Sequence, residues 1–379
     1  MTQHERLTSL DAFRGATIAA MMLVNNAGDW GHVYPQLEHA EWNGWTFTDW
    51  IFPFFLFIVG VAMTMSFARR IERGDDARKL LLNAARRSVI IFVLGLILNG
   101  APFFNLSTIR IPGVLQRIAV CYFIVSVIVL FTKTRKAQNF WLIGFLAVYW
   151  LMMKFIPVPG IGAGVLEQGK NFSAYIDSLL LSGHMYIYTQ TWDPEGIIST
   201  LPAIATTLFG VQTGYFLRSP LSREEKTVWM FVAGFVLLFI GVVLDMWLPI
   251  NKNIWTSSYS IFTAGWALIC FAVLYWLIDV KGFKLKTPLG RWYTPFVMLG
   301  MNAIAVYFVG SLIGKLSISF MLSQPDGKSM MLKTYIYQHF FAPLLTNPFH
   351  ASLLYAMMYV LGSFLLAWVM WKKQWFVKV

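Results

Sequence analysis

The sequence predicts an all-α fold: a polytopic membrane helix bundle of about ten transmembrane helices, with both termini in the cytoplasm. Of its 379 residues, 57% are hydrophobic and only 13% are charged, which is far from the balance of a soluble protein. Apolar runs near 20 residues, the length of a helix that crosses a bilayer, recur along the chain. Lysine and arginine gather in alternate loops, as they do in oriented membrane proteins.

Ten apolar segments are long enough to be spans, and no soluble domain interrupts them. We therefore expect one domain over residues 1–379, with long outer loops at 157–196 and 315–351. An element near Tyr335–Leu345 is too short to cross and is expected to lie in the interface. No small-residue cleavage site follows the first span, so we expect no cleavable signal peptide. The predicted spans are Ala12–Gly28, Thr46–Phe67, Ala84–Asn99, Gly113–Thr132, Asn139–Ile156, Ile197–Leu217, Val228–Leu248, Tyr259–Ile278, Thr294–Gly314 and Ser352–Trp371.

The distribution of positive charge sets the expected orientation. With the N-terminus inside, most of the 30 lysines and arginines fall on the inner side, from Arg6 and Arg14 through the run Arg69–Arg87 to the C-terminal Lys378. Lys133 and Lys284 belong to the same inner set. The net charge of +12 therefore indicates membrane orientation and acidic lipid as a partner, or an anionic cytosolic ligand, and not nucleic acid. The outer side holds Arg110, Arg117, Lys154, Lys170, Lys252, Lys315, Lys328 and Lys333.

The first span carries polar residues at both ends of one helical face. Asp11 and Arg14 lie at its inner end and Asn25 at its outer end, about 16 Å from Arg14 at 1.5 Å of rise per residue. Polar residues inside a membrane usually face a partner, a cavity or a substrate path. The plainer alternative is an Asp11–Arg14 pair at the headgroups and Asn25 as a helix-packing amide.

Other polar residues interrupt the third, fourth and ninth spans. Arg87 is either an inner anchor or a contact for an anionic ligand. Arg117 lies more than a turn inside the outer leaflet and needs a partner, for which Asp49 is the nearest candidate; a purely structural pair stays open. Arg291 stands at the inner mouth of the ninth span, and Asn302 is a buried amide within it.

The stretch "LEHAEWNGWTFTDW" places His39 just before the second span on the expected outer face. Glu38 and Glu41 should raise the pKa of this imidazole. Asn25 and Asp49 emerge on the same side, so a base, an amide and a carboxylate are expected to meet there. The alternative is a loop histidine without a role. Three tryptophans would hold the loop at the interface: Trp42, Trp45 and Trp50.

Other chemistries lack their patterns. The six histidines, His4 among them, show no metal-ligand spacing, so no metal is expected. Cys121 and Cys270 fall inside apolar runs and are expected to be buried thiols. There is no nucleophile elbow of a hydrolase.

Five blocks in this order resemble the heparan-α-glucosaminide N-acetyltransferase family: "LDAFRGATIAAMMLVNNAG", "LEHAEWNGWTFTDWIFPFFLFIVG", "RIPGVLQRIAVCY", "DPEGIISTLPAIATTLFG" and "LGMNAIAVYFVG". The resemblance covers essentially the whole chain. It implies transfer of an acetyl group from cytosolic acetyl-CoA, across the membrane, to a terminal glucosamine. The essential histidine and asparagine of the family carry over to His39 and Asn25, and Asn26 stands where the family more often has an aromatic residue. The resemblance also implies a bacterial inner-membrane location and a possible homodimer.

The resemblance and the residues together suggest one scheme. Acetyl-CoA enters from the inner side, and its pantetheine arm passes outward between the first, second, fourth and ninth spans. Asn25 then donates to the thioester oxygen, and Asp49 orients His39 or balances Arg117. His39 acts either as a general base or as a nucleophile that carries the acetyl group. The residues expected to bind the cofactor are Arg14, Arg87, Arg117, Gln116, Arg291 and Asn302.

On the acceptor side, Asp193, Glu195 and Trp42 are expected to bind the sugar. The plainer reading of the two acids is stabilisation of a helix N-terminus. Whether the acceptor offers an amine or a hydroxyl, and whether it is a monosaccharide, a chitin fragment or a wall sugar, stays open. Two other classes also stay open: a transporter for an amino sugar or other small anionic or sugar solute, and a non-catalytic membrane scaffold.

Overall fold

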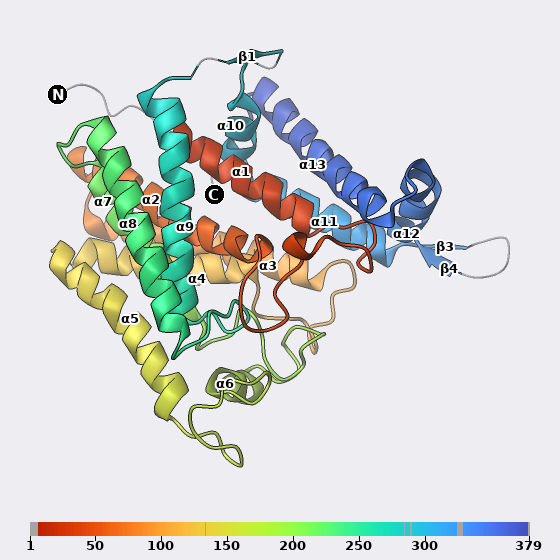
Figure 1. Cartoon of the computed structure of the whole chain (residues 1–379), viewed down its shortest axis with the longest axis horizontal. Helices are drawn as coiled ribbons and strands as arrows, with labels where there is room; N and C mark the ends of the chain where they lie inside the picture. Colours follow the sequence, from red (N-terminus) through yellow and green to blue (C-terminus); the bar gives the residue numbers. More distant parts are fainter. Residues whose placement is uncertain (1–6, 133, 284, 289, 324–328, 378–379) are drawn as a thin grey trace.

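The computed structural model describes residues 7–132, 134–283, 285–288, 290–323 and 329–377. The charge assignments of Arg6, Lys133, Lys284, Lys328 and Lys378, and His4, lie outside these residues. The described part of the chain is an all-α bundle with two short β-hairpins (Figure 1).

Each of the ten predicted spans is helical. The long helices are α1 (Thr8–Val24), α2 (Thr48–Glu72), α3 (Ala77–Gly100), α4 (Val114–Phe131), α5 (Arg135–Phe155), α7 (Thr200–Leu217), α8 (Arg223–Asp245), α9 (Ser257–Tyr275), α10 (Thr294–Met301), α11 (Ala303–Ser319) and α13 (Pro348–Lys372). A π-turn, Trp276–Val280, extends α9. The antiparallel hairpins are β1 (Lys286–Thr287) with β2 (Gly290–Arg291), and β3 (Met321–Ser323) with β4 (Ser329–Met331).

The number of membrane crossings is smaller than ten by the criteria of length and hydropathy. In the described residues six helices meet both: α2, α3, α4, α8, α9 with its π-turn, and α13. The bent pair α10–α11 makes a seventh if it is one span. Since α1 has 17 residues, and α5 and α7 do not pass either, their crossings stay predictions.

The ninth predicted span is not one continuous helix. It breaks at Asn302, whose backbone (φ −120°, ψ 30°) leaves the helical region, and α10 and α11 meet at an angle of 82°. The side-chain oxygen of Asn302 accepts a hydrogen bond of 3.0 Å from the backbone N–H of Val377. The sequence predicted that the amide of Asn302 would be buried and would need hydrogen-bond partners. Its oxygen has one, whereas the Nδ2 atom of Asn302 has none among the described atoms.

The long outer segments are more structured than predicted. Residues 157–196 contain α6 (Phe172–Leu180), and residues 315–351 contain the end of α11, the β3–β4 hairpin and α12 (Leu332–Ile336). The short element predicted near Tyr335–Leu345 consists of a π-turn at Tyr337–Phe341 and a 3₁₀ turn at Ala342–Leu344, which follow α12; its location in the interface stays a prediction. A further 3₁₀ turn, Pro35–Leu37, precedes His39.

Glycines set two close helix crossings that position the site. A Cβ atom at Gly60 of α2 would lie 2.0 Å from the carbonyl oxygen of Thr207 in α7, and one at Gly210 of α7 would lie 2.0 Å from that of Phe57. Between α1 and α10, a Cβ at Gly300 would lie 2.0 Å from the carbonyl oxygen of Asp11. Small residues allow this backbone contact between membrane helices.

The start of α1 and the last described residues lie at one end of the bundle. Val377 near the C-terminus and Arg14 in α1 line the same cavity. The β1–β2 hairpin lies on the same side as the start of α1, whereas α6 and its loops lie on the opposite side (Figure 1). We call these the inner and outer ends.

Candidate active site

An inner cavity of about 380 Å³ lies toward the inner end of the bundle, where Arg14 and Val377 line it. Its walls come from α1, α2, α3, α4, α10 and α11. These helices are the first, second, fourth and ninth predicted spans, between which the pantetheine arm was expected to pass, together with α3. Arg14 and Arg87 provide its cations, and apolar side chains such as Ile18, Met21 and Phe55 cover most of its length. A cavity that is cationic at one end and apolar along the rest fits a carrier with phosphates and a long thin arm.

The arginines predicted to bind the cofactor do not all line the inner cavity. Arg14 donates from Nη1 to the carbonyl oxygen of Gly300 (3.3 Å), and Arg87 lies over the ring of Tyr122, 5.3 Å from its centroid. Arg291 does not line the cavity: it lies in β2 and donates to the hydroxyl of Tyr293 (2.6 Å).

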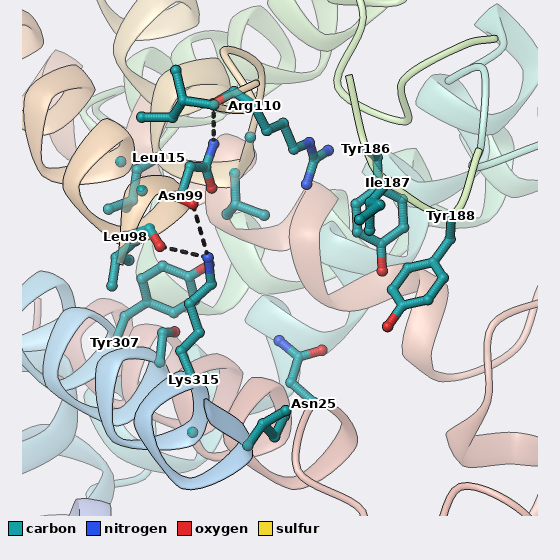
Figure 2. A pocket seen from close by; sticks show the side chains of 18 of the residues that line it. Asn25, Leu98, Asn99, Arg110, Leu115, Tyr186, Ile187, Tyr188, Tyr307 and Lys315 are labelled. Carbon is teal, nitrogen blue, oxygen red and sulfur yellow. Dashed lines mark hydrogen bonds between the residues drawn. The ribbon is translucent and has the colours of Figure 1, made fainter. Parts of the chain in front are cut away.

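An outer cavity of about 560 Å³ lies beyond the inner one, and Asn25 lines it. Asn25 is the first residue after α1. Lys315 of α11 also faces this cavity, where its Nζ donates to the carbonyls of Leu98 and Asn99 at the end of α3 (Figure 2). Gln116, predicted to bind the cofactor, lines this outer cavity and not the inner one.

The structure pairs His39 with Asp49. The two side chains meet with 2.6 Å between Nδ1 and Oδ1. The other carboxylate oxygen of Asp49 accepts the backbone N–H groups of Ala40 (3.1 Å) and Thr46 (2.9 Å). Asp49 is buried and its carboxylate only accepts, so the ring proton resides on Nδ1 and Nε2 is left as the free base. This arrangement confirms that His39 and Asp49 lie together.

The expected rise in the pKa of His39 is wrong. The positive charge of Lys252 and the partial burial of the ring lower the pKa of His39 below its ordinary value, although Asp49 acts in the opposite direction. Glu38 and Glu41 point into solvent and so have little effect. His39 is therefore mainly neutral at pH 7, as a general base must be.

Removing the charge of Lys252 should shift the pH dependence of any reaction that uses His39. Lys252→Met raises the pKa of His39, so the acid limb of a kcat/KM profile moves to higher pH, because a higher pKa keeps the base protonated to higher pH. Lys170→Met is the matched control, since Lys170 is exposed and paired with Glu167 at 2.8 Å. A profile that Lys252→Met leaves in place would contradict this account of the site.

Asp193 and Glu195 are already bound to an arginine, so the structure does not leave them free to bind a sugar. Both bind Arg110, whose Nε donates to Asp193 at 2.8 Å and whose Nη2 reaches Glu195. Burial opposes the charge of Arg110, but the two acids raise its pKa above the ordinary value. Asp177 in α6 accepts the backbone N–H groups of Asp193 and Ile197, so it holds this loop, and burial raises the pKa of Asp177 to about 6.

Arg117 is not the partner of Asp49. Its Nη2 donates to the carbonyl of Gly196 (3.0 Å) and to the hydroxyl of Ser199, and the guanidinium lies over Trp255 at 5.1 Å. The predicted pair fails because the loop before α7 lies over the start of α4 and supplies nearer oxygen atoms. Arg117 lines neither cavity.

His39 and Asn25 lie at different surfaces in this structure. Asn25 lines the outer cavity and His39 does not. Glu195 lies between the two regions: it interacts electrostatically with His39 on one side and is bonded to Arg110, which lines the cavity, on the other. Trp42 donates from Nε1 to the carbonyl of Leu166 (2.9 Å), so it fixes the loop of His39 to the outer segment.

Two cavity residues escaped sequence reasoning. Tyr307 lines both cavities, and Lys315 was assigned only to an outer loop. A single tyrosine in an apolar run does not indicate a function. Tyr307 and Lys315, however, are eight residues apart and share a helical face, so the sequence could have predicted that they line the same cavity. Among the described residues no three His, Cys, Asp or Glu side chains are grouped to hold a metal.

Comparison with known proteins gives a consistent assignment. A family model described as heparan-alpha-glucosaminide N-acetyltransferase, catalytic, matches residues 6–249, the part that carries Asn25, His39 and Asp49. The heparan-alpha-glucosaminide N-acetyltransferases of Homo sapiens and Mus musculus are each 32% identical over 355 aligned residues. These alignments cover 80% of this chain and 52% and 53% of the relatives, so the chain spans about half the length of the curated relatives it matches.

Proposed function

This chain belongs to the heparan-alpha-glucosaminide N-acetyltransferase family, and from that premise we propose that it is a transmembrane, acetyl-CoA-dependent acetyltransferase. It takes the acetyl group at the inner end of the bundle and transfers it to a glucosamine-type acceptor at the outer end. The membrane is the inner membrane of a bacterium, with both termini on the cytoplasmic side.

One observation carries this proposal. The inner cavity with Arg14 and Arg87 and the outer cavity with Asn25 have wall residues in common, so the two cavities adjoin inside the bundle. On α1, Arg14, Ile18 and Met21 face the inner cavity and Asn25 the outer one, a stripe of about 16 Å at 1.5 Å per residue. A carrier held by its phosphates at Arg14 and Arg87 therefore has an apolar route along the inner cavity to the residues that separate it from Asn25.

The chemistry at the outer end needs few groups, because a thioester is already activated. The neutral nitrogen of the acceptor attacks the carbonyl carbon, the carbon–sulfur bond breaks and CoA leaves as the thiolate. His39 accepts the proton of the attacking nitrogen on Nε2, and Asp49 stabilises the resulting imidazolium. Asn25 donates to the thioester oxygen, on which negative charge develops.

This scheme uses His39 as a base in a ternary complex. The half-exposed ring and the low pKa suit a base better than a carrier, since an acetyl-imidazole at this surface would meet water. The acceptor binds at the outer mouth beside Tyr188, whose exposed ring can stack on a sugar; the ring of Tyr186 is already covered by the guanidinium of Arg110, 4.7 Å from its centroid (Figure 2). The scheme requires His39 and Asn25 to contact the same pair of substrates, so we propose that the loop of His39 moves toward the outer cavity when the acceptor binds.

Release of CoA tests the proposal. Purified protein is incubated with acetyl-CoA labelled in the acetyl group and a panel of amino sugars, and with their N-acetylated and deaminated analogues as controls. We expect acceptor-dependent release of free CoA and label in the sugar. Binding of the sugar, or its movement across a vesicle membrane, without loss of the thioester would indicate a transporter instead.

A further inference from the structure

Three residues lie where the two cavities adjoin. Val114, Leu115 and Tyr307 line both the inner and the outer cavity, and no other residue does so in the described part of the chain. Val114 and Leu115 form the first turn of α4, and Tyr307 lies in α11, just over one turn after the break at Asn302. We call these three residues the septum.

The septum lies at the level where a bound thioester must stand. Met21 faces the inner cavity and Asn25, one turn further along α1, faces the outer one. Under the proposed function, the phosphates stay with Arg14 and Arg87 while the carbonyl reaches Asn25. The reacting carbonyl therefore passes between Val114, Leu115 and Tyr307.

Tyr307 is the one septum residue whose side chain can donate a hydrogen bond. The side chain of Ser311, on the same face of α11, bonds to the Tyr307 hydroxyl. Either hydroxyl can donate in this bond, and when Ser311 donates, the phenol keeps its own proton for another acceptor. Lys315 follows one turn beyond Ser311. All three residues line the outer cavity, where Figure 2 shows Tyr307 and Lys315, and of the three only Tyr307 also lines the inner cavity.

We infer that Tyr307 is a catalytic residue whose hydroxyl donates to the thioester oxygen, as a second donor beside Asn25. The inference rests on the proposed acetyl transfer. As the acceptor nitrogen bonds to the carbonyl carbon, the carbonyl π electrons move onto the oxygen and both donors stabilise that charge. When the carbon–oxygen double bond re-forms, the carbon–sulfur bond breaks and CoA leaves as the thiolate; Tyr307 keeps its proton throughout.

The test uses Tyr307→Phe, which keeps the ring that separates the cavities and removes only the donor. We expect kcat to fall about 10²-fold, the effect of removing one oxyanion donor. The Kd for acetyl-CoA should change less than about threefold, since the ring and the phosphate contacts remain. A merely structural tyrosine would leave kcat close to that of the wild type, and that result would overturn the inference.

A second readout does not depend on turnover. With acetyl-CoA carrying ¹³C at the carbonyl, infrared difference spectra report the C=O stretch of the bound thioester, which hydrogen-bond donors move to lower frequency. Tyr307→Phe should move it up. Tyr359→Phe is the matched control: Tyr359 lines the outer cavity, but its hydroxyl already donates to the carbonyl of Gly310 (2.7 Å), so the frequency should stay in place.

The two readouts separate the inference from the proposed function. An unchanged frequency in Tyr307→Phe, together with acetyl transfer by the wild type, overturns the role of Tyr307 alone. A frequency that rises in Tyr307→Phe, in a wild-type protein that transfers acetyl to no acceptor, supports the contact with the carbonyl and contradicts the transferase.

Discussion

His39→Ala is expected to lower acetyl transfer about 10³-fold and to leave the Kd for acetyl-CoA within about twofold of the wild type. A positioned general base contributes roughly 10²–10⁴-fold. The binding of acetyl-CoA should survive because Arg14, Arg87 and the apolar wall of the inner cavity lie on other elements, and His39 lines neither cavity. Rates are measured with labelled acetyl-CoA at saturating acceptor, and affinity by calorimetry in detergent.

A second histidine in the same region provides the matched control. His32 also pairs with a carboxylate, with 2.7 Å between its Nδ1 and Oδ2 of Asp29, and its side chain is 41% exposed against 47% for His39. His32 does not line the outer cavity. His32→Ala should therefore transfer acetyl at the wild-type rate. Equal losses in the two variants would mean that the effect arises from disturbed outer loops and not from a base.

Gly60→Val is expected to destabilise the bundle by about 3 kcal/mol or more, the upper end of overpacking effects in protein cores. A Cβ atom at Gly60 would lie 2.0 Å from the carbonyl oxygen of Thr207 and 2.8 Å from the backbone nitrogen of Val211. These are backbone atoms, so no side chain can turn away, and α2 and α7 must separate. Unfolding in mixed micelles by circular dichroism measures the loss.

Gly144→Val is the control for this substitution. Gly144 lies inside α5 and a Cβ atom there would meet nothing within 4 Å. Its stability should stay within about 1 kcal/mol of the wild type, the difference in helix propensity being of that size. If both variants lost stability equally, the α2–α7 crossing would not be the cause.

The helices could be predicted from the sequence, since each predicted span is helical. Their continuity could not. At the break, the side chain of Asn302 accepts a hydrogen bond from the backbone N–H of Val377, 75 residues away, and the apolar run around Asn302 does not predict this contact. The sequence did not predict α6 either, because a nine-residue helix inside an outer segment contains no long apolar run.

The site was predictable where its residues are close in sequence. His39 and Asp49 are ten positions apart and meet as expected. Arg110 and Arg117 found their oxygen partners at Asp193, Gly196 and Ser199, about 80 positions on, where no local pattern points. The pKa of His39 is lowered and not raised, because Lys252, in the loop before α9, adds a positive charge that the sequence around His39 does not predict.

We propose that the acetyl group crosses the membrane while CoA does not. Sealed vesicles with the inner end of the bundle facing the lumen are loaded with acetyl-labelled acetyl-CoA, and glucosamine is added outside. Orientation is verified by protease access to the C-terminus. We expect labelled N-acetylglucosamine outside, free CoA inside, and about 10³-fold slower appearance of product when His39 is replaced by alanine. Product and free CoA on the same side of the membrane would contradict it.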